Sequence, residues 1–408
     1  MADNKDKKVL NVPALRFPEF TDEWKRIKVS DLLDFYSTNS LSWEQLEYEP
    51  NEPYNLHYGL IHVGLPTLID LTKDKLPSIK NGNVPKKYEL CKEGDVAFAD
   101  ASEDTNEVAK VVEFYNLGGK KVVCGLHTIH GRNNNGQTAK GFLGYCFSST
   151  VFHNQIRRIA QGTKIYSINT RNFSEVFVGL PRRREQQKIA TLLRLIDERI
   201  ATQNKIIEKL ETLIKGIVEL AFSHAATSNT LGCYITQISQ RNKIGKNLPV
   251  LSVSNKHGFV EQSEQFEDRI IASDDTSNYK IVSINDFAFN PARINVGSIA
   301  RLKDKECGIV SPMYICFRTS KDILPEYLEL FFKTVMFSFE VKKRLEGSVR
   351  LCLSYESLCE IVIPVISIRE QHSLVKMVTA FYSKLGVEKI FLRSCQSQRQ
   401  YLLSQMFI

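Results

Sequence analysis

The chain has 408 residues, 43% hydrophobic and 25% charged, and this composition excludes a disordered protein. It is long enough for two ordinary globular domains with connecting elements. The formal net charge of +8 favours an anionic partner, most simply nucleic acid, although many basic proteins bind none.

Nine cysteines are scattered along the chain without a Cys-x-x-Cys pair. They support neither a zinc ribbon nor a disulfide framework, so we expect a reducing compartment. The N-terminus is charged where a signal peptide would be apolar, and no apolar run approaches the length of a membrane span. We therefore expect a cytoplasmic protein with no membrane association.

Two regions, residues 12–183 and 228–368, are rich in β-branched and aromatic residues in short runs with turn residues between them. Such runs predict strands, and they occur at residues 121–123, 176–178, 249–253 and 360–363. A related pair of runs, residues 94–99 and 285–290, is offset by 191 positions. Both regions are predicted to be mixed domains dominated by strands.

Between these regions, residues 185–222 predict one long helix with a sustained apolar seam. The seam steps alternate between four and three residues, with one polar interruption, through Ile189, Leu193, Ile196, Ile200, Gln203, Ile207, Leu210, Ile214, Ile217 and Ala221. A helix this long and this one-sided is not stable alone, so it needs a partner.

The second half of the chain repeats the first at a constant offset, the one that separates Gly162 from Gly347. With the same offset, Glu175, Arg184, Glu185 and Gln186 correspond to Glu360, Arg369, Glu370 and Gln371. The seam recurs in weaker form at Leu374, Val378, Phe381, Leu385, Glu388, Leu392, Cys395, Arg399, Leu402 and Met406. Two related units in one chain imply approximate twofold symmetry.

We therefore predict an α+β fold, with two strand-rich domains related by a pseudo-twofold axis and joined by two long antiparallel coiled-coil helices. The expected boundaries are residues 1–183 for the first domain, 184–222 for the central helix, 223–368 for the second domain and 369–408 for the C-terminal helix. In the alternative arrangement, each helix packs on its own domain as an ordinary amphipathic helix.

Motifs of catalysis are missing from the sequence, so no catalytic residue is predicted. There is no Gly-x-x-x-x-Gly-Lys-[Ser/Thr] loop for a nucleotide and no glycine loop for a dinucleotide or a methyl donor. Residues 290–293 (Asn-Pro-Ala-Arg) begin like an amino-methyltransferase motif but lack the aromatic residue that would stack on an extruded base.

Metal ligands are not predicted either. His127 and His130 are three residues apart, but they occupy a strand-like context without a Cys or Asp at a telling distance, which favours a structural role. Residues 100–104 form an acidic cluster that we interpret as an exposed loop. A carboxylate there could alternatively accept a hydrogen bond from a cytosine amino group.

The remaining polar motifs are typical of DNA reading. Residues 289–298 follow an apolar strand and combine Asn and Arg, whose side chains suit bidentate contacts to adenine and guanine. Two matching loops after Gly162 and Gly347 each carry a small hydroxyl residue and a cation. The predicted DNA-binding residues are Thr163, Lys164, Tyr166, Asn290, Arg293, Asn295, Ser298, Ser348 and Arg350. For any one of them, a surface loop with a solvated side chain is an equally good interpretation.

Together these features resemble the specificity subunit of type I restriction-modification systems. The resemblance covers essentially the whole chain: two variable domains, each followed by a long helix that opens at residues 184–190 (Arg-Glu-Gln-Gln-Lys-Ile-Ala) or 369–372 (Arg-Glu-Gln-His). Residues 16–20 (Arg-Phe-Pro-Glu-Phe), Trp24 and residues 29–33 also look like the start of such subunits. His372, Glu388 and Arg399 depart from the first copy.

The resemblance implies that each recognition domain reads one half of a bipartite, asymmetric double-stranded DNA target, while the helices fix the unread spacer. It implies a subunit without catalytic residues or a cofactor of its own. Its partners would be two modification subunits that carry S-adenosylmethionine and methylate adenine, and restriction subunits that use ATP and Mg. Residues 100–105 and 290–298 differ completely between the units, so two different half-sites are expected.

Two other functions remain open at this point. A DNA enzyme that acts alone would methylate or cleave DNA without partners. A scaffold that uses the coiled coil only to join proteins would bind no DNA sequence selectively.

Overall fold

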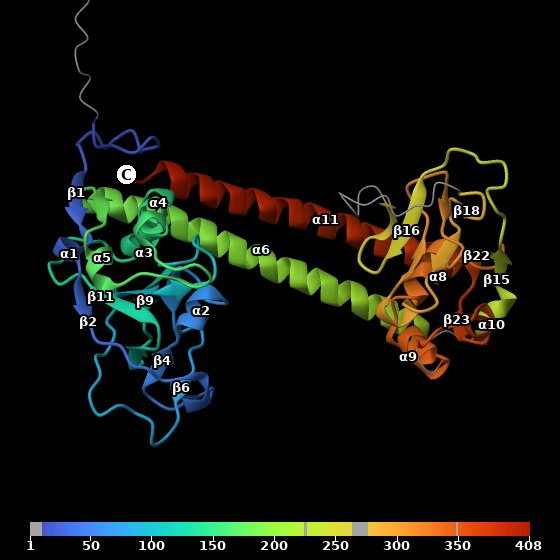
Figure 1. The fold of residues 1–408 in the computed structure, drawn as a ribbon, viewed down its shortest axis with the longest axis horizontal. Helices are drawn as coiled ribbons and strands as arrows, with labels where there is room; N and C mark the ends of the chain where they lie inside the picture. The colour runs from blue at the N-terminus through green and yellow to red at the C-terminus, as the bar shows by residue number, and fades with distance from the viewer. Residues whose placement is uncertain (1–9, 224–226, 263–275, 348–349) are drawn as a thin grey trace, which may run out of the picture. The chain divides into compact units, whose positions relative to one another are not determined.

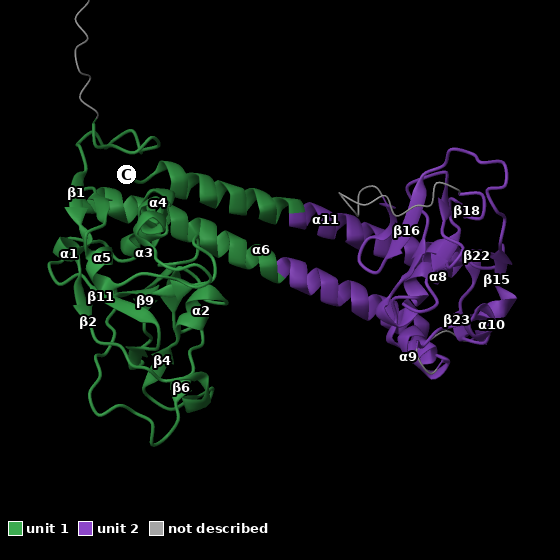
Figure 2. Cartoon of the chain, viewed as in Figure 1, with its two compact units in different colours: residues 1–205, 390–408 green, residues 206–389 purple. Residues whose placement is uncertain are grey.

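The protein is seen in a computed structural model, in which the chain divides into two compact units (Figures 1 and 2). The structure describes residues 10–223, 227–262, 276–347 and 350–408. Unit 1 comprises residues 1–205 and 390–408, and unit 2 comprises residues 206–389. The division therefore runs through both long helices, α6 (Arg183–Ser223) and α11 (Ile368–Gln405). The predicted boundaries of the recognition domains stay a prediction.

Unit 1 is built on two sheets and several short helices. One sheet has five strands in the order β2-β11-β7-β9-β5, and the other has four in the order β10-β4-β6-β3. Two small ribbons, β1-β13 and β12-β8, complete it. The strands are β1 (Lys25–Lys28), β2 (Asp34–Tyr36), β3 (Leu46–Glu47), β4 (Tyr54–Leu56), β5 (Leu68–Asp70), β6 (Ser78–Ile79), β7 (Val96–Ala99), β8 (Ala101–Ser102), β9 (Val111–Asn116), β10 (Val122–Cys124), β11 (Thr128–Arg132), β12 (Tyr166–Ser167) and β13 (Phe177–Leu180). The helices are α1 (Val29–Leu32), α2 (Tyr58–His62), α3 (Phe142–Phe147), α4 (Thr150–Ile159), α5 (Thr170–Ser174), the first part of α6 and the last part of α11.

Unit 2 repeats this plan with fewer strands among its described residues. Its two four-stranded sheets have the orders β15-β22-β19-β20 and β17-β16-β21-β18, and β14-β23 forms a ribbon. The strands are β14 (Thr227–Thr230), β15 (Ile235–Ile238), β16 (Val250–Ser254), β17 (Gly258–Glu261), β18 (Lys280–Ser283), β19 (Phe287–Phe289), β20 (Ile299–Arg301), β21 (Cys307–Val310), β22 (Ile315–Thr319) and β23 (Val362–Val365). The helices are the last part of α6, α8 (Pro325–Phe331), α9 (Val335–Lys343), α10 (Tyr355–Cys359) and the first part of α11.

The predicted strands and the α+β class are confirmed, and each unit has its own aromatic core. In unit 1, Phe98, Phe147, Phe152 and Phe173 are fully buried against one another. In unit 2, Phe287 and Phe317 stack with ring centroids 5.1 Å apart. None of the helices in the described part of the chain combines the length and apolar composition that a membrane crossing requires.

In the last part of each unit, the helices and strands of the two copies start at the constant offset of the sequence repeat. The first residues of α4 and α9, Thr150 and Val335, are separated by the offset of the sequence repeat, and so are those of α5 and α10, which have the same length. Strands β13 and β23, and the starts of α6 and α11, keep this offset too. Corresponding residues cap the helices, since the side chains of Ser149 and Thr334 both accept from a backbone N–H three residues on. The repeat is therefore one supersecondary arrangement used twice.

Within unit 1, the beginning of α6 packs against the end of α11. Ile189, Leu193 and Ile196 share a buried cluster with Leu402 and Met406. The Arg399 guanidinium donates to Asp197, and the Arg199 guanidinium lies 4.6 Å from the centre of the Phe391 ring. Arg399 interrupts the predicted apolar seam because it forms an ion pair at that position.

Within unit 2, the end of α6 packs against the beginning of α11, so the two helices run antiparallel. Leu210 and Ile214 join Leu374, Val378 and Leu385 in one buried cluster. In the last two turns of α6, the most buried residues are Val218 and Phe222. The predicted seam has Ile217 and Ala221 there, so the buried face is displaced by one residue. A straight helix drifts about 20° per heptad from a strict 3.5-residue repeat, which explains this shift.

Each of the two long helices has a buried glutamine in its first turn, and the two side-chain amides make equivalent hydrogen bonds. Gln186 Oε1 accepts the Ala139 N–H at 2.7 Å, and its Nε2 donates to the carbonyls of Gln137 and Pro181 at 3.1 and 2.9 Å. In unit 2, Gln371 Oε1 accepts the Leu324 N–H at 2.9 Å, and its Nε2 donates to the carbonyls of Asp322 and Ile366 at 3.4 and 2.9 Å. Each backbone partner in unit 1 has its counterpart in unit 2 at the offset of the sequence repeat.

The neighbouring glutamate differs between the units. Glu185 is buried and accepts from the Arg16 guanidinium at 2.7 and 2.8 Å and from Trp24 Nε1 at 3.2 Å. Glu370 instead caps its own helix by accepting from the backbone and the hydroxyl of Ser367. Arg16 and Trp24, near the N-terminus, therefore bind the first turn of α6.

Replacing Gln186 by leucine tests the importance of the buried amide. Gln186→Leu leaves one backbone N–H and two carbonyls without their partner, so the free energy of unfolding of unit 1 should fall by about 1–3 kcal/mol. Urea denaturation followed by tryptophan fluorescence measures it, because both tryptophans of the chain, Trp24 and Trp43, lie in unit 1. Gln187 is exposed, so Gln187→Leu is the matched control and should change stability by less than about 0.5 kcal/mol. Equal losses in the two variants would contradict this role.

Candidate nucleic-acid interface

Two hairpins with the same backbone design carry the loops predicted from Gly162 and Gly347. Gln161 and Ser167 exchange backbone hydrogen bonds of 2.9 and 2.8 Å, and Glu346 and Cys352 exchange bonds of 3.0 and 2.8 Å. The glycines have φ angles of 135° and 123°. A Cβ atom would lie 1.9 Å from the carbonyl oxygen of Ile165 in the first hairpin and 2.2 Å from that of Arg350 in the second. Only glycine fits at these positions.

The hairpin of unit 1 exposes two of its three predicted DNA-binding residues. Thr163 and Lys164 are exposed, as is the apolar side chain of Ile165. Tyr166 is half-buried against the core of unit 1. In unit 2, Arg350 is exposed, whereas Ser348 lies outside the described residues.

Each hairpin lies beside the loop that follows a buried strand. The Ile168 N–H donates to the carbonyl of Asp100 at 2.9 Å, and the Leu353 N–H donates to that of Pro291 at 3.1 Å. Asp100 follows β7 and Pro291 follows β19, so the two contacts are equivalent. The segments at residues 100–104 and 290–298, which share no sequence, therefore occupy the same place in the two units.

The loop of unit 2 presents Arg293 and Asn295 to solvent and uses Asn290 and Ser298 internally. Asn290 is buried, and its Oδ1 accepts the Ala292 N–H at 3.0 Å. Ser298 is buried too, and its hydroxyl donates to the Val253 carbonyl at 3.0 Å. These two residues shape the loop in the structure, and a role in DNA contact stays a prediction for them as it does for Arg293 and Asn295.

The loop of unit 1 is acidic where that of unit 2 is basic. Asp100 Oδ1 lies 3.1 Å from His127 Nδ1. Burial raises the pKa of Asp100, and the neighbouring His127 opposes this shift. Arg157 donates to Asn106 Oδ1 at 2.7 Å and connects the far end of the loop to α4. The sequence analysis does not predict that His127 and Arg157 contact this loop, since they come from segments with no DNA-reading motif.

An ion pair with a buried aspartate supports each loop. Arg132 donates to both carboxylate oxygens of Asp95 at 2.9 and 2.8 Å, and Arg318 donates to both of Asp286 at 2.6 and 2.8 Å. The aspartates end the turns that lead into β7 and β19, and the side chain of each also accepts a backbone N–H from three residues earlier. The two loops therefore follow strands that are anchored in the same way.

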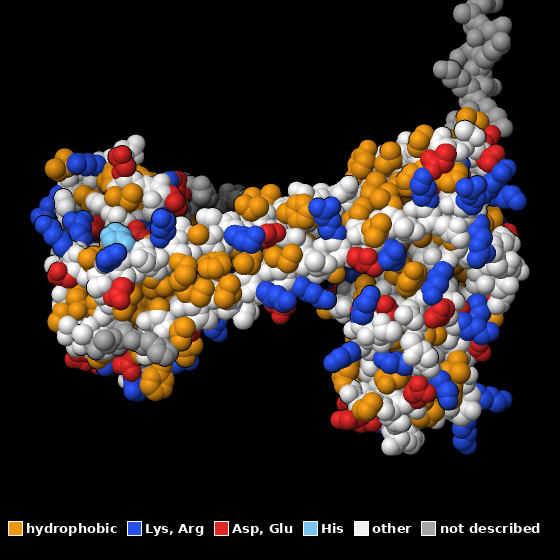
Figure 3. Space-filling view, turned by 180° about the vertical axis from the view of Figure 1, so that it is seen from behind, with side chains coloured by type: hydrophobic (Ala, Val, Ile, Leu, Met, Phe, Trp, Pro, Cys, Tyr) orange, Lys and Arg blue, Asp and Glu red, His pale blue; other side chains and the backbone are white. Residues whose placement is uncertain are grey.

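The surface in Figure 3 carries both signs of charge over both units. Lysine and arginine side chains alternate with acidic ones, and apolar side chains are exposed along the helical segments. The exposed apolar residues of these helices include Leu195, Leu213 and Leu220 of α6 and Val387 and Ile390 of α11. Positive charge is thus distributed over the units rather than gathered in one patch on this face.

Comparison with known proteins finds a matching domain model and a similar fold. Residues 115–212 match the family model described as the type I restriction modification DNA specificity domain. The crystal structure of a type I restriction-modification system S subunit from M. genitalium has 18% sequence identity and a TM-score of 0.57, with 97% of this chain and 99% of that chain covered. A comparison with curated proteins finds no match.

Two further solved structures are similar. One, described as showing complex assembly and conformational transition of the type I R-M system, has 14% identity and a TM-score of 0.57, with 93% of this chain and 96% of that chain covered. The HsdS subunit from Thermoanaerobacter tengcongensis has 15% identity and a TM-score of 0.47, with 93% and 95% covered. The resemblance to type I specificity subunits is thereby confirmed: residues 115–212 match the model of the specificity domain, and the chain has the fold of these S subunits.

Proposed function

We propose that this protein is the DNA sequence-specificity subunit of a type I restriction-modification complex, in which each unit reads one half of a bipartite, asymmetric target. The observation that carries the proposal is the pair of loops held at equivalent places beside equivalent hairpins, with different side chains. One framework with two loop sequences is suited to reading two different half-sites. The matched specificity domain and fold support the same conclusion.

The long helices would fix the unread spacer and dock two modification subunits in the cytoplasm. Their exposed apolar side chains support docking, because a solvated helix face does not need Leu195, Leu220 or Val387 in contact with water. The modification subunits would carry S-adenosylmethionine for adenine methylation. Restriction subunits would supply ATP- and Mg-dependent cleavage, and this chain would contribute no catalytic residue or cofactor.

Mapping of DNA methylation tests the proposal as a whole. Co-expression of the chain with a modification subunit from the same source should produce methylated adenines within one gapped, asymmetric motif, detected by modification-sensitive sequencing of host DNA. The motif should be absent when this chain is omitted. If a complex shown to be assembled and loaded with methyl donor yields no motif, a scaffold without sequence-selective binding becomes the better interpretation.

The exposed Arg293 gives a residue-level prediction. If it contacts a base directly, Arg293→Ala should weaken target binding by about 1–3 kcal/mol and relax one base position. The assembled complex would be titrated with a set of duplexes that differ at single positions of one half-site. Lys321→Ala is the control, because Lys321 is an exposed cation after β22, at the opposite end of the sheet from the loop that follows β19. Equal weakening on all duplexes would make Arg293 a phosphate contact.

The helix pair gives a prediction about spacer length. Four residues inserted after Gln203 and four after Glu388, which the repeat makes equivalent, lengthen each helix by about 6 Å. This is close to two base pairs, at about 3.4 Å each, so the unread spacer of the methylated motif should grow by about two. Insertion into α6 alone should instead reduce stability. An unchanged spacer in the double insertion would show that the helices do not set it.

A further inference from the structure

Three side chains with metal-binding chemistry meet in the interior of unit 1. Cys91 precedes β7, Cys124 ends β10 and His130 lies in β11. The two sulfur atoms are 3.6 Å apart, and one ligand atom from each of the three residues lies within 4.8 Å of the others. All three side chains are buried. The group does not overlap with the recognition loops.

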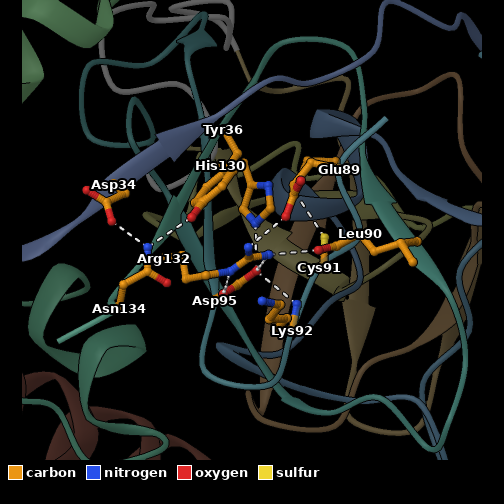
Figure 4. A network of polar contacts seen from close by, with 11 residues as sticks. Asp34, Tyr36, Glu89, Leu90, Cys91, Lys92, Asp95, His130, Arg132 and Asn134 are labelled. Atoms are coloured by element: carbon orange, nitrogen blue, oxygen red, sulfur yellow. Dashed lines mark hydrogen bonds and ion pairs between the residues drawn. The ribbon is translucent and has the colours of Figure 1, made fainter. Parts of the chain in front are cut away.

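His130 is held in the orientation that metal-binding histidines adopt. Its Nε2 lies 2.7 Å from Asp95 Oδ2 (Figure 4). In the neutral imidazole, a proton on this nitrogen would be donated to the carboxylate, and Nδ1 would carry the lone pair that a metal ion needs. Nδ1 is buried and has no hydrogen-bond partner within the described part of the chain. A buried nitrogen in this state is unsatisfied unless it binds something.

The surroundings of the group suit a dication. Arg132 bridges Asp95 to Glu89 and lies over the Tyr36 ring, so one guanidinium faces two carboxylates (Figure 4). Exchange of the two thiol protons for one dication leaves the net charge of the cluster unchanged. Binding would therefore bury no additional net charge.

Unit 2 shows that the fold does not require these residues. In unit 1, Leu90 and Val123, the residues before the two cysteines, form a β-bridge. The equivalent pair in unit 2 is Ile281 and Ile309. The residues that follow them, Val282 and Val310, therefore take the places of Cys91 and Cys124. Cys316 takes the place of His130, since each lies opposite an alanine of the neighbouring strand, Ala288 or Ala97. The three replacements belong to one apolar cluster. The same position is thus an ordinary core in unit 2 and a set of ligands in unit 1.

We propose that Cys91, Cys124 and His130 form a Zn²⁺ site inside unit 1, with Asp95 orienting the histidine. Two thiolates bound to a tetrahedral zinc ion at about 2.3 Å lie about 3.8 Å apart, close to the separation of these sulfur atoms. Two sulfur ligands and one imidazole select zinc over magnesium or calcium. The ion would connect β10 of one sheet to β11 of the other.

Metal analysis of the full-length chain, purified under reducing conditions and dialysed against buffer without chelator, tests the site. About one equivalent of zinc per chain is expected, and Co²⁺ substitution should give the sulfur-to-cobalt charge-transfer absorption of a thiolate site. Cys91→Val with Cys124→Val copies the residues of unit 2 and should lose the zinc and the absorption. Cys146→Val is the control, because Cys146 is a buried thiol of the same unit outside the group.

Three results would overturn the proposal. The first is that the wild-type chain binds no zinc, even after refolding in its presence. The second is metal content that is unchanged in the double variant. The third is a disulfide between Cys91 and Cys124, detected by mass spectrometry in chain purified under reducing conditions. If the double variant does not fold, X-ray absorption of the wild-type zinc decides the matter, since fewer than two sulfur ligands would exclude the site.

Discussion

The buried amide at the start of each long helix is the constraint on which the rest of the structure depends. Gln186 and Gln371 each bind three backbone groups that come from two different segments of their units. A shift of one residue in any segment would leave a buried N–H or carbonyl without a partner. The amide therefore fixes where the helix begins and the direction in which it leaves the unit. This explains why the offset between the two copies is kept without a gap here, whereas it changes among the earlier strands.

Much of the fold could be predicted because periodicity and repetition are properties of the sequence itself. The long helices, the main strands and the equivalence of the two halves follow from apolar spacing and from matching motifs. The two partners of Glu185, Arg16 and Trp24, could not be predicted. They are far away in the chain, and no repeat or periodic pattern of the sequence connects them to Glu185. A strict 3.5-residue repeat predicts Ile217 and Ala221 in the seam, whereas an α-helix has about 3.6 residues per turn, which brings Val218 and Phe222 to the buried side instead.

The candidate interface shows the same division between pattern and geometry. The sequence identified the segments, because glycines and polar residues after apolar strands mark loops. It could not separate Asn290 and Ser298, which are buried and bonded within their loop, from Arg293 and Asn295, which are exposed, since all four side chains are polar. The grouping of Cys91, Cys124 and His130 was missed for a related reason. These residues lie on separate segments, and only strand pairing brings them together.

Residues 402–407, in and directly after the last turn of α11, contribute to a core whose first residues lie near the other end of the chain. Leu402, Leu403 and Phe407 are buried with Trp24 and Phe142, and the Leu15 N–H donates to the Gln405 carbonyl at 2.9 Å. These residues are synthesised only after all of unit 2. The core of unit 1 therefore lacks these residues during most of translation, and the apolar surface that they cover stays exposed, although the strands of unit 1 emerge from the ribosome first. Chaperones that shield exposed apolar segments would meet this protein at its first unit rather than at its second.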